Sequence, residues 1–250
     1  MAWSENSLQG SYVMFDLHVH SKFSHDSFAE PKHILKVASR RGLQGIAITD
    51  HNVFRPFSSA LSKEVIVIKG CEVKTEVGDI TGLFLTEGIK SRMSLDVVDE
   101  IRDQGGLVVL PHPFRDHKRP AVIVEHVDVV EGFNARVPFE KNERAIKLGL
   151  KCGKPLIAGS DAHFAFEVGR GLTLANDACS ADELEKAILN NNISIRGVRF
   201  PNWHLSALYI MSKAVEARRN PKMIPNSAWK LISGKSALHS YSTSKRTSFI

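Results

Sequence analysis

The sequence predicts an α/β domain built around a parallel sheet or barrel. Strand-like apolar runs alternate with segments of helical periodicity along most of the chain, a pattern typical of parallel sheets covered by helices. The 250 residues match the length of a single (β/α) barrel. Polar residues follow several strand-like runs at their C-terminal ends, where the active sites of such barrels form.

Residues 12–49 form the first strand–helix–strand unit. Tyr12–Val19 is apolar and β-prone, Pro31–Arg41 carries apolar residues at helical spacing, and Gly45–Thr49 is a short apolar run after a glycine.

Residues 65–110 continue the alternation. Val65–Val73 and Ile80–Leu85 are strand-like, and Ser94 is expected to cap a helix that stops at Gly105 and Gly106. Leu107–Leu110 is the next expected strand.

Residues 127–196 supply the last expected elements. Val127–Gly132, Pro155–Gly159 and Ile193–Arg196 are strand-like, while Phe139–Leu150 and Ser180–Asn190 have helical periodicity. Because no internal repeat or low-complexity linker interrupts this region, residues 10–198 are expected to form one domain.

The C-terminal region differs from this domain in charge. The net charge of the chain is +6, and the residues from Arg196 onward carry ten basic side chains and one acidic side chain, which leaves −3 for the preceding 195 residues. Residues 199–232 are expected to form a helical basic extension, and residues 233–250 a disordered tail. A basic tail can bind nucleic acid or anionic surfaces, and a solvated, loose terminus is the alternative.

Composition excludes several classes of protein. With 43% hydrophobic and 24% charged residues, the chain has the composition of a soluble globular protein. Its apolar stretches fall short of the roughly 18 residues that a membrane span needs, and the first twelve residues do not resemble a secretory signal. We therefore expect a cytoplasmic protein. Three widely spaced cysteines argue against a disulfide framework or a thiolate zinc site.

Five polar segments follow strand-like runs and predict a metal site. They are Asp16–His20, Thr49–His51, Gly70–Glu72, Pro111–Pro113 and Ser160–His163. His18 and His20 lie two apart on a strand, so both side chains point to one face and can bind one ion. Each segment alone also fits a core pair or a helix cap. Burying all of them without a compensating ion would be costly, so together they favour metal binding.

The motifs DLHVHS, ITDH, GCE, HP and GSDAH occur in this order, and over Tyr12–Gly197 the chain resembles the polymerase and histidinol phosphatase (PHP) superfamily. The resemblance implies a distorted (β/α)7 barrel that holds two or three divalent ions, with manganese, zinc or iron suited to the ligands. It also implies a hydrolase that cleaves a phosphate ester by metal-activated hydroxide. Phosphomonoesters, nucleotides and oligonucleotides all fit as substrates.

The resemblance assigns metal ligands by position, and in a phosphoesterase the ligands of the first ion are also the catalytic set. His18, His20, Glu72 and Asp161 correspond to the ligands of the first ion. Glu72 would bridge to a second ion that His112 also holds. His51, His163 and Asp26 correspond to the third site, with His25 as the alternative to Asp26.

Two features of the pocket stay open. Relatives usually have a further histidine for the second ion, but none lies between His51 and His112, so Asp79 or Asn134 are the alternatives. Asn134 could also orient substrate. Arg136 and Arg170 could clamp phosphate oxygens, or could be ordinary surface charges.

Asp16 and Asp50 are expected to orient ligand histidines, or to be plain strand-end caps.

Two other functions compete with the phosphoesterase. An RNA-binding barrel subunit of a ribonucleoprotein, similar to a component of ribonuclease P, would suit the basic tail but has no need of seven convergent ligands. An amidohydrolase also begins with HxH but usually lacks the histidine that follows Asp161. The expected partner is a phosphorylated small molecule or a nucleic acid, and no membrane.

Overall fold

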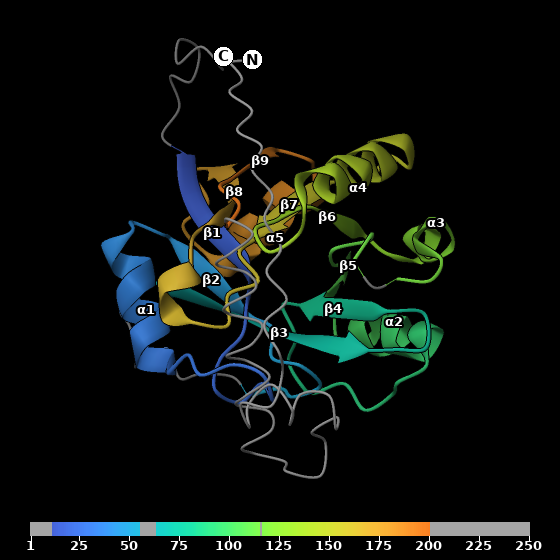
Figure 1. Cartoon of the computed structure of the whole chain (residues 1–250), viewed down its shortest axis with the longest axis horizontal. Helices are drawn as coiled ribbons and strands as arrows, with labels where there is room; N and C mark the ends of the chain where they lie inside the picture. Colours follow the sequence, from blue (N-terminus) through green and yellow to red (C-terminus); the bar gives the residue numbers. More distant parts are fainter. Residues whose placement is uncertain (1–11, 56–63, 116, 201–250) are drawn as a thin grey trace, which may run out of the picture.

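The computed structural model describes residues 12–55, 64–115 and 117–200. They form a nine-stranded mixed sheet in the order β7-β6-β5-β4-β3-β2-β1-β8-β9, which curves into a nearly closed barrel (Figure 1). The strands are β1 Tyr12–Val19, β2 Gly45–Ile48, β3 Ile66–Lys74, β4 Asp79–Leu83, β5 Leu107–Leu110, β6 Val129–Asn134, β7 Leu156–Gly159, β8 Gly171–Asn176 and β9 Ile193–Gly197. The α-helices are α1 Pro31–Arg40, α2 Ser94–Asp103, α3 Pro120–Ile123, α4 Phe139–Lys151 and α5 Ala181–Leu189.

The predicted α/β barrel class is confirmed, but the sheet is not all parallel. β3 and β4 form an antiparallel pair, β4 also pairs antiparallel with β5, and β8 runs antiparallel to β1 and β9. β8 was not expected from the sequence. The turn between β3 and β4 is too short for the crossover that a parallel pair requires, and this forces the antiparallel arrangement.

The barrel closes between β1 and the segment that follows β7. Asp161 N donates to His18 O and His20 N donates to Ala162 O, both at 2.8 Å. β7 also contacts β1, β8 and β9. Because these bonds join the C-terminal ends of two strands, they place the polar residues of both ends next to each other.

A hydrophobic cluster fills the barrel and is closed by α5. It draws buried residues from β1 to β8 and from α5, and these are Phe15, Leu17, Ala47, Ile68, Leu83, Leu107, Val109, Val129, Ile157, Ala175, Leu184 and Ile188. A packed interior of apolar side chains from many strands is typical of (β/α) barrels. α1, α2 and α4 lie around the outside of the sheet (Figure 1), whereas α5 contacts β3 and β8. Two further clusters, packed under α1 and α2, form the outer core.

The helix starts differ in one place from the sequence prediction. Ser94 is the first residue of α2 rather than its cap, and its Oγ donates to Glu76 Oε1 at 2.6 Å. Ser180 does cap α5, because its side chain accepts from Glu183 N.

None of the helices among the described residues could span a membrane. The expected basic extension and tail lie outside the described residues, apart from positions 199 and 200.

Candidate metal centre

The structure brings the eight predicted metal ligands into one cluster at the C-terminal ends of the strands. They are His18, His20, Asp26, His51, Glu72, His112, Asp161 and His163. All except Asp26 and His51 are buried. An acid and imidazole cluster of this density inside a protein requires compensation of its charge.

His18, His20, Glu72 and Asp161 form the centre of the cluster. Nε2 of His18 and Nε2 of His20 lie 3.1 Å apart. Glu72 Oε2 lies 3.2 Å from the first nitrogen and 3.3 Å from the second, and Asp161 Oδ1 lies 3.2 Å from His20 Nε2. Two nitrogens bound to one zinc ion at tetrahedral angles are about 3.3 Å apart. The donor atoms therefore fit a shared divalent cation.

The carboxylate of Glu72 faces two groups of side chains at once. Its Oε2 lies near the nitrogens of His18, His20 and His51, whereas its Oε1 lies 2.9 Å from His112 Nε2. A carboxylate placed in this way can bridge two ions. Ligand atoms of Glu72, Asp79 and His112 lie within 4.8 Å of one another and form a further candidate group.

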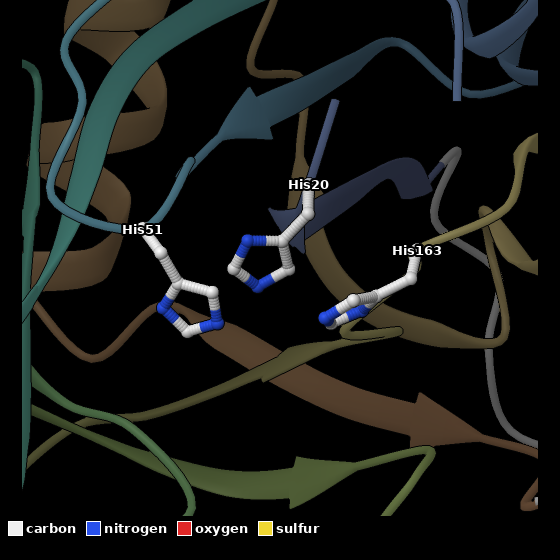
Figure 2. Close-up of side chains that lie close together, drawn as sticks. All are labelled: His20, His51 and His163. Atoms are coloured by element: carbon white, nitrogen blue, oxygen red, sulfur yellow. The ribbon is translucent and has the colours of Figure 1, made fainter. Parts of the chain in front are cut away.

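A third group consists of His20, His51 and His163, whose nearest ring nitrogens lie within 4.8 Å of one another. Figure 2 shows the three rings side by side, carried by segments that follow β1, β2 and β7. Asp26 Oδ2 lies 2.8 Å from His163 Nε2 and 3.5 Å from His51 Nε2. The His25 ring lies 5.2 Å from the His51 ring, between centroids. Of the two alternatives, Asp26 is the one placed against both histidines.

Glu131 positions this cluster, and sequence reasoning assigned it no role. Its Oε1 lies 3.0 Å from His18 Nδ1, and its Oε2 accepts from His112 N at 2.8 Å and from Asn134 Nδ2 at 3.0 Å. A proton on His18 Nδ1 would leave Nε2 free to bind a cation. Glu131 lies near the end of a predicted strand, and this strand-end position was the signal that could have identified it.

Within the described residues, Asp16 and Asp50 form no hydrogen bond or ion pair with the imidazole rings of the cluster. Asp16 accepts from Ser160 N and Oγ and from Gly169 N. Asp50 accepts from Ser21 N and Oγ at 2.6 and 2.7 Å. Both carboxylates therefore hold the loops that follow the strands, which agrees with the alternative of strand-end caps. The contact with His18 Nδ1 comes from Glu131 instead.

The three predicted substrate residues have different positions. Asn134 is buried, and its amide donates to Glu131 and, at 3.3 Å, to Asp161 Oδ2. Arg136 lies beside the cluster, with Nε 4.0 Å from Glu167 Oε1. Arg170 instead lies with its guanidinium 4.3 Å from the centre of the Phe200 ring, and within the described residues it forms no ion pair with the cluster.

Arg115 is a second residue that sequence reasoning missed. Its Nη1 lies 2.5 Å from Asp161 Oδ2, and its side chain is 28% exposed. It lies two positions after the His-Pro motif, which itself follows a predicted strand. This position near a strand end was the signal that could have identified it. The guanidinium presents a positive charge at the exposed side of the cluster.

Mutual attraction keeps the centre ionised in the metal-free protein. Burial lowers the pKa of His20, but hydrogen bonds to Asp161 and Glu72 outweigh it and raise that pKa from 6.5 to about 9. Burial raises the pKa of Glu72, yet the charges of His18 and His51 hold it well below its usual value. Burial is the main cause that lowers the pKa of His163, to about 4. The centre thus alternates positive and negative groups.

The backbone is shaped closely around the cluster. His112 and Asp161 have φ values of 27° and 53°, in a left-handed region that costs free energy in non-glycine residues and clusters at functional sites. A Cβ added to Gly159 would overlap His18 Cβ. Only glycine therefore lets β7 approach β1 closely enough to seat His18.

Comparison with known proteins agrees with this geometry. The PHP domain family matches residues 16–109, and the PHP-associated family matches residues 139–193. Two uncharacterized proteins of Methanocaldococcus jannaschii are 37% identical over 166 residues and 42% identical over 114 residues. These matches cover 62% and 40% of this chain, and 67% of each relative.

A solved structure supports the same fold. It is a two-domain protein of Bacteroides vulgatus containing a predicted PHP-like metal-dependent phosphoesterase. It has a TM-score of 0.60 and 18% identity, and the match covers 85% of this chain and 75% of that chain. With the motif order, the barrel and the convergent histidines and carboxylates, these matches show that the chain belongs to the PHP superfamily.

Proposed function

We propose that the protein is a metal-dependent phosphoesterase that hydrolyses a phosphate ester. The observation that carries the proposal is the cluster of eight convergent candidate ligands around Glu72, whose two carboxylate oxygens face different histidines. Its oxygen and imidazole donors suit manganese, zinc or iron, in two or three sites. Divalent cations held there would supply Lewis acidity and lower the pKa of a coordinated water.

The chain's own side chains would bind and orient the phosphate. Arg115 lies against Asp161 and is part-exposed, and Arg136 is held beside Glu167 close to His163. Guanidinium groups bind phosphate oxygens through paired hydrogen bonds. A phosphate at the exposed side of the cluster would therefore meet positive charge.

The test combines metal content with substrate range. Elemental analysis of protein never exposed to chelator should show more than one transition-metal ion per chain. Phosphomonoesters, cyclic nucleotides and short RNAs should then be assayed with manganese, zinc and iron, and at least one class should be hydrolysed. At most one ion per chain with no gain on adding manganese, or no hydrolysis in a metal-loaded sample, would overturn the proposal.

A pair of arginine variants tests the phosphate contact. Arg115→Gln should raise KM for the substrate found, because it removes a guanidinium at the cluster. Arg170→Gln is the matched control, since its guanidinium lies over Phe200. Equal effects of the two variants would contradict the role of Arg115 in binding.

A further inference from the structure

One corner of the cluster is richer in oxygen ligands than the rest. Asp79 begins β4, which pairs antiparallel with β3, and the pairing sets Thr81 directly opposite Glu72. Residues directly opposite each other in such a pair share one face of the sheet, and residues two apart on a strand do also. Asp79, Thr81 and Glu72 therefore project from the same face.

Asp79 is buried without a direct hydrogen bond or ion pair in the part of the chain that the structure describes. Its residue exposure is 9%. Its oxygen lies within 4.8 Å of ligand atoms of Glu72 and His112. Two carboxylates buried side by side repel each other unless a cation or a proton compensates them.

Thr81 gives a second, independent observation. Its residue exposure is 2%, and its Oγ1 is buried with no hydrogen-bond partner in the described part of the chain. Buried hydroxyls are normally satisfied, so an orphan next to a carboxylate pair indicates a missing ligand or water. The alternative completing residue, Asn134, already donates to Glu131 and Asp161.

We propose that Glu72, Asp79 and His112 bind one divalent cation, with Thr81 Oγ1 facing the same ion or a water on it. This inference rests on the proposed function, and it specifies which ion the site takes. Two carboxylates, one hydroxyl and a single imidazole form a harder donor set than the imidazole-rich groups elsewhere in the cluster. Oxygen donors suit manganese and magnesium, whereas imidazole suits zinc. The site should therefore favour manganese or magnesium over zinc, relative to its neighbours.

The experiment measures metal binding without any substrate. Protein stripped by chelation is titrated with Mn²⁺ and separately with Zn²⁺ in a calorimeter, and bound metal is counted after gel filtration. Asp79→Asn should lose one equivalent of Mn²⁺, or bind it at least about 10-fold more weakly. Asp79→His should shift the preference between the two metals toward Zn²⁺ by about 10-fold, because imidazole suits zinc better than a carboxylate does. Thr81→Val should also lower the affinity for Mn²⁺.

Asp99→Asn, which changes an exposed acid on α2, is the matched control and should bind metal as the unmodified protein does. Near-ultraviolet circular dichroism checks that each variant is folded. Unchanged stoichiometry and affinity in both folded Asp79→Asn and Thr81→Val would overturn this inference while leaving the phosphoesterase proposal intact. An unmodified protein that binds no metal would overturn both.

Discussion

Replacing Glu131 by glutamine tests whether a buried carboxylate sets the orientation of the metal ligands. In the structure the two oxygens of Glu131 face three donors, on His18, His112 and Asn134. Glutamine keeps the shape but has one oxygen and one NH₂ group. Whichever way the new amide is turned, its NH₂ group faces at least one of these donors.

The two orientations have different costs. If the amide NH₂ faces His18 Nδ1, that nitrogen must accept, and the proton moves to Nε2 and blocks the atom proposed to bind the cation. If it faces His112 N and Asn134, a buried backbone donor is left without an acceptor. An unsatisfied buried group costs about 1–3 kcal/mol, which is roughly 5–150-fold in an equilibrium constant. Loss of such an orienting contact typically weakens metal binding by about 10–100-fold, which lies within this range.

Competition against a chromophoric chelator at fixed pH measures this affinity. Glu131→Gln should bind Zn²⁺ about 10–100-fold more weakly. Its far-ultraviolet circular dichroism spectrum should match that of the unmodified protein, which shows that the variant is folded. Glu143→Gln, on an exposed position of α4, is the matched control and should leave affinity unchanged. A folded Glu131→Gln protein whose affinity falls less than about 3-fold would refute the reasoning.

Three further predictions follow from the cluster and the tail. Glu72→Gln should reduce turnover at least ~100-fold without unfolding the chain, because it removes the negative charge of the carboxylate proposed to bridge two ions. Retained activity in the folded variant would contradict this. In metal-free protein the pKa of His20 is raised from 6.5 to about 9, so its contribution to the free energy of unfolding is full below pH 6.5 and is lost as pH rises to 9. Urea unfolding across this range should show that decrease, and a flat profile would argue against it. Removing the residues after Ala217, which lie outside the described residues, should raise KM for RNA and flatten its salt dependence if the basic tail recruits polyanions; equal losses for RNA and a small phosphomonoester would indicate packing instead.

Local sequence patterns determined most of the secondary structure of this protein and the place of its polar cluster. Apolar periodicity predicted β1 with its exact bounds, Tyr12–Val19, and most other elements within a few residues, because strand and helix periods are properties of short segments. Polar motifs at strand ends predicted a convergent cluster, since parallel strands bring those ends to one side of a barrel.

Only the tertiary structure decided which of these segments meet. The antiparallel pairing of β3 with β4 sets Thr81 opposite Glu72, and no periodicity in either strand shows this. Glu131 contacts a histidine 113 positions away, and Arg115 contacts an aspartate 46 positions away. Such contacts depend on barrel closure and strand register, which arise from the packing of the whole core rather than from any short stretch of sequence.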